Sequence, residues 1–263
     1  MTGMGAMDYE RRFGGIARLY GEAALIRFAS SHICIIGIGG VGSWVAEALA
    51  RSAVGALTLI DLDHIAESNV NRQIHALEGQ FGRAKTEAMQ ERIEAINPAC
   101  RVISHDEFAD TENLGRLIRP DYDYVIDCID AYRTKAAIIA HCRRGKIRVI
   151  TAGGAGGQID PLKITLADLS RTQQDPLLAK TRKLLRREYG FPSNLKRRFE
   201  VPCVYSSEQS RYPSVDGTTC LDKSSGIVNT GLNCGGFGSA MPVTATFGLV
   251  AVSYVLKKLA EPP

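Results

Sequence analysis

Glycines at residues 37 to 42 have a spacing that suits the binding of a phosphate group. The segment reads GIGGVG, and its glycines are Gly37, Gly39, Gly40 and Gly42. Such a turn lets backbone N–H groups approach an anion with no side chain in the way, and the helix N-terminus that follows favours negative charge. Asp61 stands about 20 residues further on, where a carboxylate can accept the ribose hydroxyls of a nucleotide. These residues predict a nucleotide site; an ordinary glycine turn and a turn aspartate are the alternatives.

A long polar segment begins at Asp61. Residues 61 to 82, DLDHIAESNVNRQIHALEGQFG, hold too many polar side chains for a core element. Loops longer than about 12 residues in a compact domain are usually functional. We therefore expect this segment to contribute to the site, and we expect His75 within it to be a surface side chain.

Apolar runs on either side of the glycine turn indicate the elements that position it. Residues 33 to 36 form a buried strand by pattern, a helical pattern begins at Ser43, and a second strand is expected at 57–60. Helices are then expected at 84–96, 112–118 and 133–144, and strands at 101–104, 124–126 and 149–151. This alternation predicts an α/β fold with a doubly wound, mostly parallel, Rossmann-like sheet, whose ligand lies beyond the carboxyl ends of the strands.

The pattern changes after residue 160. We expect a strand at 164–166, a basic helix at 175–188, a Gly-, Ser- and Thr-rich stretch at 200–238 and an apolar helix at 240–256. A chain of 263 residues is long enough for one large α/β domain with an extension. The expected organisation is a single domain, 1–263, made of an N-terminal arm (1–30), a nucleotide-binding core (31–160) and a C-terminal extension (161–263) that carries the basic helix.

Positive charge is concentrated between Lys180 and Arg198. This segment holds eight Lys and Arg residues and one acidic residue, Glu188, a net charge of +7 in a chain whose net charge is +4. The cations that suit nucleic-acid phosphates are Lys180, Lys183, Arg186, Arg187, Lys196, Arg197 and Arg198, and the nearby rings that could stack on bases are Tyr189, Phe191, Phe199 and Tyr205. A solvated charged face, with rings that only pack, is the alternative.

The cysteines indicate the cellular compartment in which the protein is expected. Seven cysteines, an odd number with no CxxC pair, indicate reduced thiols and a cytoplasmic protein with no tetrathiolate zinc. The first residues show no pattern of a secretory signal.

Residues 240 to 256 are apolar but at the short limit of the roughly 20 residues that cross a bilayer. We expect a buried helix on one face of the sheet, with a membrane anchor as the alternative.

A series of motifs in the first half of the chain has a distinctive order. They are GIGGVGS at 37–43, Asp61 and Asp63, SNVNRQ at 68–73, Lys85, and DCIDAYRTK at 127–135. In order and spacing they resemble the adenylating superfamily that includes the ubiquitin-activating enzymes and the adenylating enzymes of molybdopterin and thiamine synthesis.

Further motifs resemble one branch of this superfamily. They are RFGGIARLYG at 12–21, INPAC at 96–100, TAGGAGGQIDP at 151–161, VDGTTC at 215–220 and VTATFG at 243–248. The branch is that of the tRNA threonylcarbamoyladenosine dehydratases. The resemblance implies ATP-dependent cyclisation of the threonylcarbamoyl group on the adenosine beside the anticodon of certain tRNAs, and a homodimer.

The resemblance also implies roles for single residues. ATP would contact the four turn glycines and Asp61, Asp63, Asn69, Arg72, Gln73 and Lys85. Arg72 and Lys85 would act in catalysis by stabilising the phosphates. Asp130 would act with them as the carboxylate for Mg²⁺, assisted by Asp127. In the alternative interpretation Lys85 is a solvated surface side chain, and the two aspartates are helix N-terminal carboxylates.

Two features depart from the better-known branches. Those branches hold a structural zinc with paired CxxC motifs, which this sequence lacks. They also have an N-terminal arginine that reaches into the partner subunit; Gly15 stands at that position here, and Arg12 or Arg18 would have to replace it.

Cys234 resembles the position that forms a thioester or persulfide elsewhere in the superfamily, and a small buried hydrophobe is the alternative. A cysteine desulfurase or a sulphur-acceptor protein is therefore a further candidate partner.

Three other functions stay open at this point. An adenylating enzyme for the C-terminus of a ubiquitin-like or sulphur-carrier protein would share the nucleotide motifs, but the cationic helix and the missing CxxC pairs count against it. An NAD-binding oxidoreductase would need only the glycine turn and Asp61, and it leaves SNVNRQ and Lys85 without a purpose. A catalytically idle tRNA-binding or sulphur-relay scaffold would use the same basic surface.

Overall fold

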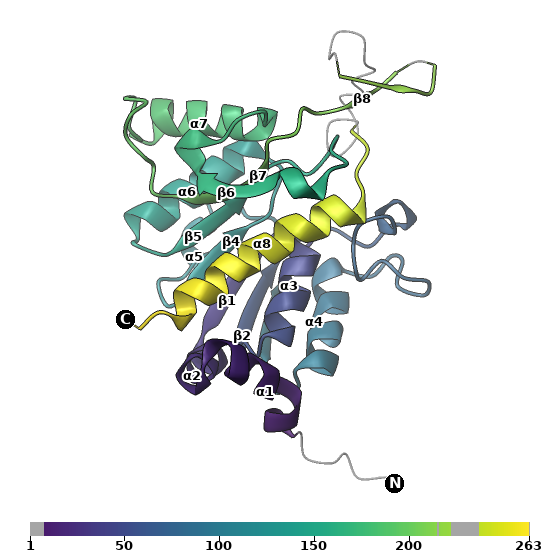
Figure 1. The fold of residues 1–263 in the computed structure, drawn as a ribbon, viewed down its shortest axis with the longest axis vertical. Helices are drawn as coiled ribbons and strands as arrows, with labels where there is room; N and C mark the ends of the chain where they lie inside the picture. Colours follow the sequence, from purple (N-terminus) through teal and green to yellow (C-terminus); the bar gives the residue numbers. More distant parts are fainter. Residues whose placement is uncertain (1–7, 215, 222–236, 263) are drawn as a thin grey trace.

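The computed structural model describes residues 8–214, 216–221 and 237–262. Seven strands form one sheet in the order β3-β2-β1-β4-β5-β7-β6 (Figure 1). The strands are β1 (His32–Ile36), β2 (Ala56–Ile60), β3 (Arg101–His105), β4 (Tyr124–Asp127), β5 (Val149–Ala152), β6 (Ile164–Asp168) and β7 (Pro202–Ser206); β8 (Tyr212–Pro213) and β9 (Thr219–Cys220) pair separately. All pairs in the large sheet are parallel except β6 with β7. The predicted α/β fold with a mostly parallel sheet is confirmed.

The strand order reverses between β1 and β4. Ile33 of β1 pairs with Leu57 of β2 on one side and with Tyr124 of β4 on the other. The loops that leave these strands stay in contact, because Gly37 N–H donates to the Ile60 carbonyl at 2.9 Å and Cys128 N–H donates to the Ile36 carbonyl at 2.8 Å. In open parallel sheets, ligands bind beyond the carboxyl ends of the strands at such a point.

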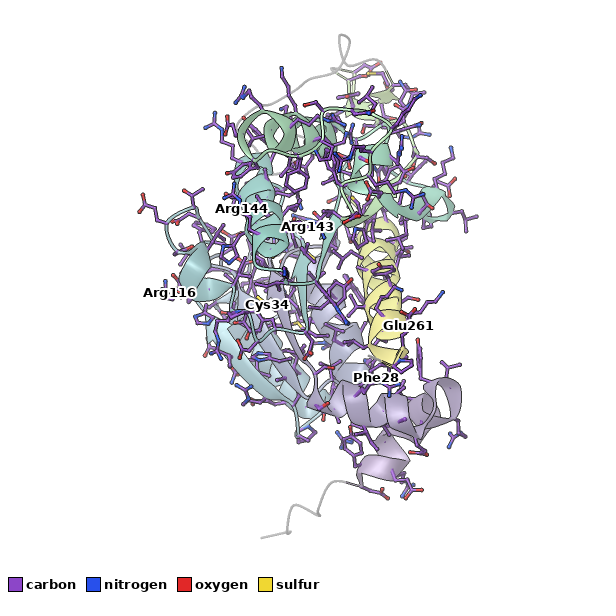
Figure 2. All side chains as sticks on the ribbon, turned by 90° about the vertical axis from the view of Figure 1, so that its left-hand side faces the viewer. Phe28, Cys34, Arg116, Arg143, Arg144 and Glu261 are labelled. Atoms are coloured by element: carbon purple, nitrogen blue, oxygen red, sulfur yellow. The ribbon has the colours of Figure 1, made fainter. Side chains whose placement is uncertain are left out.

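Helices cover both faces of the sheet. They are α1 (Tyr9–Tyr20), α2 (Glu22–Ser30), α3 (Gly42–Arg51), α4 (Lys85–Ile96), α5 (Leu114–Leu117), α6 (Tyr132–Arg144), α7 (Pro176–Glu188) and α8 (Met241–Ala260). Ile33 and Ile35 point into the core under α2, α3 and α8, whereas Cys34 and Ile36 point into the core under α5, α6 and α7. Figure 2 shows α6 and α8 on opposite sides of the sheet. Two covered faces explain why the strands are continuous apolar runs in the sequence.

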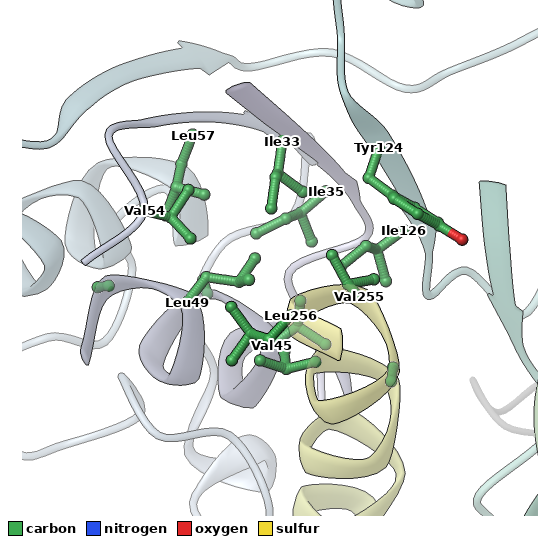
Figure 3. Close-up of a cluster of buried hydrophobic side chains, with 14 of the residues drawn as sticks. Ile33, Ile35, Val45, Leu49, Val54, Leu57, Tyr124, Ile126, Val255 and Leu256 are labelled. Atoms are coloured by element: carbon green, nitrogen blue, oxygen red, sulfur yellow. The ribbon is translucent and has the colours of Figure 1, made fainter. Parts of the chain in front are cut away.

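One core cluster lies between β1, β2 and β4 and the helices α3 and α8 (Figure 3). Leu49 of α3 and Phe247 of α8 are fully buried there. Complete burial of side chains of this size contributes about 1.5–3 kcal/mol each. The two helices approach closely because Gly248 has no side chain: a Cβ at this position would lie 2.9 Å from the Val41 carbonyl oxygen and 3.2 Å from Trp44 Cβ. This packing joins the C-terminal helix to the glycine turn.

Helix α8 is apolar because it is part of the core. Its length and its mean hydropathy of 1.4 would allow a membrane span, yet 56% of that apolar window is buried inside the protein. It packs against β5, β6 and β7 and against α2 and α3. The expectation of a buried helix on one sheet face is confirmed, and the helix extends to Ala260 rather than ending at residue 256.

The segment after residue 160 completes the sheet. It supplies both β6 and β7, and β7 inserts between β5 and β6. The sequence did not indicate β7, because PCVYS begins with a proline, which cannot donate to a neighbouring strand, and follows no strand-length apolar run. The helix expected at 112–118 is reduced to the single turn of α5.

The N-terminal arm is helical, and its arginines cap the ends of other helices. Arg12 donates to the carbonyl of Ile96 at 2.6 Å, at the C-terminus of α4. Arg27 donates to the carbonyl of Leu259 at 2.9 Å, at the C-terminus of α8. The ends of α2 and α8 are marked by Phe28 and Glu261 in Figure 2. Cations at these positions satisfy free carbonyls and complement the helix dipole, so Arg12 is engaged within its own chain.

Candidate active site

The glycine turn connects β1 to α3 at the point where the strand order reverses. Gly37 has a φ of +86°, in the left-handed region that side chains rarely adopt. A Cβ on Gly42 would lie 1.8 Å from the Gly37 carbonyl oxygen, so only glycine permits this contact between helix and turn. No side chain caps α3. Its N-terminus can therefore face an anion directly.

Asp61 follows β2 and holds the turn in place. Its Oδ2 accepts the N–H of Ile38 at 2.6 Å, and its Oδ1 accepts the N–H of Asp63 at 2.8 Å. Burial raises the pKa of the Asp61 carboxyl, while Lys85 and the two backbone amides act in the opposite direction. Each carboxylate oxygen can accept more than one hydrogen bond. Asp61 can therefore order the turn and accept from a ribose at the same time.

Lys85 opens α4 and is buried. Its side chain is 7% exposed, and its Nζ donates to Asp63 Oδ2 at 2.7 Å. The backbone repeats the contact, since Lys85 N–H donates to the Asp63 carbonyl at 3.0 Å. The interpretation of Lys85 as a solvated surface side chain is therefore wrong. The charge of Lys85 also acts on Asp61, which places the ammonium group near the glycine turn.

Arg72 lies against the glycine turn from the polar segment. Trp44 of α3 donates from Nε1 to the Arg72 carbonyl at 2.9 Å, and a Cβ on Gly40 would lie 3.2 Å from Arg72 Cγ. The guanidinium donates to the Ser68 carbonyl and to the Asn71 side chain, each at 2.9 Å. These partners are neutral, so within the described residues the charge of Arg72 is not compensated by a carboxylate. A phosphate group would supply that compensation.

Two buried acceptor atoms in the same segment have no protein partner: Gln73 Oε1 and His75 Nδ1. His75 Nε2 lies 3.0 Å from the Ile38 carbonyl oxygen, which can only accept, so Nε2 carries a proton. Burial lowers the pKa of His75 to about 4, so the ring is neutral at pH 7. The expectation of a surface role for His75 is wrong, because the residue is 2% exposed. Asn69, also buried, accepts the N–H of Ala66 at 3.1 Å.

The two aspartates after β4 have different surroundings. Asp127 is fully buried, and its Oδ2 accepts from Lys135 Nζ at 2.8 Å and from Thr151 Oγ1 at 2.6 Å. Its Oδ1 accepts the N–H of Ile129 at 3.2 Å. Asp130 is exposed, and it takes part in none of the ion pairs found among the described residues. Asp127 is therefore engaged inside the protein, whereas Asp130 is accessible to a cation.

Lys135 is the residue of this region that sequence reasoning missed. It is fully buried, and its charge acts on Asp175, the N-cap of α7, as well as on Asp127. Asp175 in turn accepts the N–H of Gly154 at 2.9 Å in the turn after β5. The available signal was that Lys135 precedes Ile138 by three residues, which places it on the apolar face of its helix.

Helix α7 presents the predicted cationic outer face. Leu178, Thr181, Leu184 and Leu185 are buried. The candidate cations form what we call the basic face: Lys180, Lys183, Arg187, Lys196, Arg197 and Arg198 are exposed, and Arg186 is partly buried. Arg186 lies over the Phe199 ring at 5.0 Å. Phe199 is 2% exposed and packs edge-on against Phe191 at 5.0 Å, so this pair packs the core and does not offer a stacking surface.

Thiols and metal-ligating side chains are the remaining candidates within the described residues. There, no group of three or more His, Cys, Asp or Glu side chains is placed to hold a metal ion. Cys234 lies outside the described residues. Cys128 follows Asp127, and burial raises its pKa to about 12, so it is protonated and unreactive at pH 7.

These features define the class. A glycine turn at the switch point of a parallel sheet, with a buried lysine and an uncompensated arginine beside it, is the arrangement expected of a nucleotide-binding site in an α/β protein. Residues 9–263 match the model of the ThiF family, and the chain belongs to this family.

Relatives of known name cover nearly the whole chain. It is 54% identical to the tRNA threonylcarbamoyladenosine dehydratase of Escherichia coli (strain K12) over 252 residues, 95% of this chain and 94% of that protein. It is 52% identical to the protein of the same name from Haemophilus influenzae over 264 residues, 99% and 98% of the two chains. Among solved structures, E. coli TcdA in complex with ATP is similar, with a TM-score of 0.86, 51% identity, and coverage of 97% and 96%.

Proposed function

We propose that this chain is an ATP-dependent tRNA threonylcarbamoyladenosine dehydratase. It cyclises the threonylcarbamoyl group on the adenosine next to the anticodon, through an acyl-adenylate. The observation that carries the proposal is 54% identity over 95% of the chain to the E. coli protein of that name. The site supports it, because two cations lie beside the glycine turn and a phosphate group would compensate one of them.

The first step joins the substrate carboxylate to the α-phosphorus of ATP. A carboxylic acid with a pKa near 4 is ionised at neutral pH, so the attack needs no general base. The carboxylate oxygen forms the new P–O bond, and pyrophosphate leaves with the electrons of the bond that breaks. Arg72 and Lys85 stabilise the charge on the phosphoryl oxygens, and each such donor in a dry site contributes on the order of 3 kcal/mol.

The second step closes a ring within the adenylated substrate. The ureido group attacks the activated carbonyl carbon, AMP leaves, and one proton is released. The nucleoside loses one water in total, while ATP becomes AMP and pyrophosphate. Both reacting groups belong to one molecule, so their effective concentration is high. The step therefore does not require a protein nucleophile such as Cys234.

Asp130 suits a magnesium ion. Magnesium typically takes one or two carboxylates together with phosphate oxygens and water, and Asp130 is an exposed carboxylate outside the ion pairs of the described chain. When bound, the ion would neutralise phosphate charge. We assign Asp127 to the support of the loop that carries Asp130, because its oxygens already accept from Lys135, Thr151 and Ile129.

The basic face is the proposed contact with tRNA. Its exposed lysines and arginines lie on α7 and in the loop that follows. If five of them contact phosphates, the logarithm of the binding constant should fall with the logarithm of salt concentration with a slope of roughly −3.5 to −4.5.

The experiment that tests the function is mass spectrometry of tRNA nucleosides. Purified protein is incubated with ATP, Mg²⁺ and tRNA that carries the threonylcarbamoyl group, and we expect the modified adenosine to lose the mass of one water. Asp130→Ala, with its fold checked by circular dichroism, should form little product. An unchanged nucleoside, together with ATP–pyrophosphate exchange that responds to a carrier protein and not to tRNA, would reject the proposal in favour of a carrier-protein adenylating enzyme.

We also propose a cytoplasmic homodimer, on the basis of the resemblance. Arg18, exposed on α1, is the arginine that could reach the partner subunit, because Arg12 caps α4. A sulphur-transferring protein stays a proposed partner through Cys234. Light scattering should give twice the mass of the 28.5 kDa chain, and a monomer would remove the role of Arg18.

A further inference from the structure

A hollow of about 230 Å³ lies between α6 and α7. Its lining is Tyr132, Lys180, Lys183, Leu184 and Arg187. Tyr132 is the first residue of α6, and the other lining residues belong to α7. The inner wall is apolar, since Leu184 is buried, whereas Lys180, Lys183 and Arg187 are exposed at the rim. We call this hollow the Tyr132 pocket.

Two cations lie over the Tyr132 ring. Lys180 Nζ lies 5.8 Å from the ring centre and the Arg133 guanidinium lies 5.7 Å from it. Among the described residues, Lys180 and Lys183 take part in no ion pair, and Arg187 pairs only with the exposed Glu188. Exposed pairs of that kind contribute little. The rim therefore has an excess of positive charge beside an aromatic ring.

This combination suits a single unpaired nucleotide. Unpaired bases stack on aromatic rings whatever their sequence, and lysine and arginine contact the phosphates on either side. The pocket also lies near the reacting centre. Tyr132 follows Asp130 by two residues, so their Cα atoms are at most about 7 Å apart.

We propose that the Tyr132 pocket holds an unpaired nucleotide of the substrate RNA, with its base on the Tyr132 ring and its phosphates against Lys180, Lys183 and Arg187. This inference rests on the proposed function, in which the reacting adenosine belongs to a single-stranded loop. A flanking nucleotide held two residues from Asp130 fixes the position of the adenosine at the ATP site. Stacking on Tyr132 then adds to the affinity that the basic face provides by charge alone.

Binding of a labelled anticodon stem-loop RNA, followed by fluorescence anisotropy, tests the pocket. Stacking on an aromatic ring is worth about 1–3 kcal/mol per base, so Tyr132→Leu should weaken stem-loop binding by about 5- to 150-fold, and Tyr132→Phe should stay within about twofold of wild type. A duplex RNA of equal length should bind both variants as it binds wild type. Tyr20→Leu, on α1, is the matched control for loss of a partly buried tyrosine.

Charge and stacking can be separated by salt. Tyr132→Leu should leave the salt slope unchanged, whereas Lys183→Gln should reduce it by about 0.7–0.9. If Tyr132→Leu, whose melting temperature and ATP binding are measured first, does not fold, Tyr132→Met is the second variant, and it should show the same loss of stem-loop binding. Equal stem-loop binding by wild type and Tyr132→Leu, or equal losses for stem-loop and duplex, would overturn the inference.

The experiments distinguish an error in the pocket assignment from an error in the proposed function. If wild type dehydrates the RNA and Tyr132→Leu binds it equally well, the pocket assignment falls and the function stands. If wild type neither binds nor changes the RNA, both fall. If CMP alone binds wild type but not Tyr132→Leu while RNA affinity is equal in both, the pocket serves a free nucleotide, and the assignment to RNA is wrong.

Discussion

At the scale of single residues, two buried charges support the loop that carries Asp130. Asp127 and Lys135 are both fully buried, and Thr151 donates to the same Asp127 oxygen that accepts from Lys135. A buried ion pair is tolerated only when its members satisfy one another, because a lone charge in the core is strongly destabilising. The pair thus fixes the conformation at the end of β4. Asp127 also accepts the N–H of Ile129, and this hydrogen bond orders the loop that carries Asp130.

Lys135→Met should therefore reduce the free energy of unfolding by about 3–5 kcal/mol, because it leaves Asp127 buried and unpaired. Urea unfolding followed by circular dichroism measures the change. Lys163→Met, at an exposed lysine, is the control and should lie within about 0.5 kcal/mol of wild type. Asp127→Asn combined with Lys135→Met should lose less than the two single variants added together. Additive losses would show that the pair does not act as a unit.

His75 makes stability depend on pH. Its pKa is about 4 in the folded protein, below its ordinary value of 6.5, because the ring is buried. Between pH 6.5 and pH 4 the unfolded chain binds a proton that the folded chain does not. The free energy of unfolding should therefore fall as the pH decreases through this window, with about 2 kcal/mol lost from this residue at pH 5.

His75→Gln removes that titration. Urea unfolding at pH 7.5 and at pH 5 should show a smaller acid loss in the variant than in wild type, by about 2 kcal/mol. His64→Gln, at an exposed histidine, is the matched control and should follow wild type at both values. The same pH dependence in all three proteins would contradict a neutral buried His75.

Arg72 is expected to act on the transition state. Arg72→Ala should lower the rate of AMP formation by about 10²- to 10³-fold, as when one charged donor is removed from a transition state. Arg83→Ala serves as the control, because Arg83 lies further along the same chain segment and pairs with Glu91 at 2.6 Å. RNA binding should be equal in both variants. A loss of RNA binding in Arg72→Ala would instead place Arg72 in the tRNA contact.

At the scale of elements, α7 has an apolar inner face and a cationic outer face. Leu178 and Leu185 on its inner face are fully buried, while Lys183 and Arg187 on its outer face are exposed. Asp175 caps its N-terminus and accepts the Leu178 N–H at 2.9 Å. Because packing and capping hold the helix, its outer face can be changed without loss of the fold.

Lys183→Glu combined with Arg187→Glu should weaken tRNA binding and make its salt slope shallower by at least about 1.4, the contribution of two lost phosphate contacts. Filter binding at several salt concentrations measures the slope. Lys257→Glu on α8, also an exposed cation, should leave both quantities unchanged. An unaltered slope in the double variant would mean that α7 is a solvated face and no contact.

At the scale of the whole molecule, the C-terminal helix packs against the glycine turn. Gly248 of α8 packs against the Val41 carbonyl and against Trp44. Val41 belongs to the glycine turn, and Trp44 donates to the Arg72 carbonyl. A residue near the end of the chain therefore sets the position of groups that are near its beginning in sequence.

Gly248→Ala should destabilise the protein by about 1–3 kcal/mol, because its Cβ would lie 2.9 Å from a backbone oxygen that cannot move freely. It should also weaken ATP binding, measured by calorimetry at a temperature where the variant is folded. Gly115→Ala is the control, since nothing lies within 4 Å of a Cβ at that position. Unchanged ATP affinity in Gly248→Ala would show that the packing of α8 does not affect ATP binding.

The core strands could be predicted because burial on both faces makes them apolar runs, as at residues 33 to 36 and 57 to 60. The strand β7 could not, because PCVYS becomes a strand only when β5 and β6 bond to it. The same limit applies within the site. The motif predicts Lys85 as a site residue, and that role stays a prediction. The burial of His75 within a polar segment depends on the Ile38 carbonyl, which lies 37 residues earlier.

The sequence by itself determined the alternation of strands and helices, the glycine turn and the concentration of cations before Arg198, because these depend on residues that are close together in the chain. Only the tertiary structure decided that Asp127 is held by Lys135 and Thr151 while Asp130 is exposed, and that Tyr132 faces the cations of α7. The reason is physical: burial and charge pairing depend on which distant segments of the chain come into contact, and the spacing of residues along the chain does not specify those contacts.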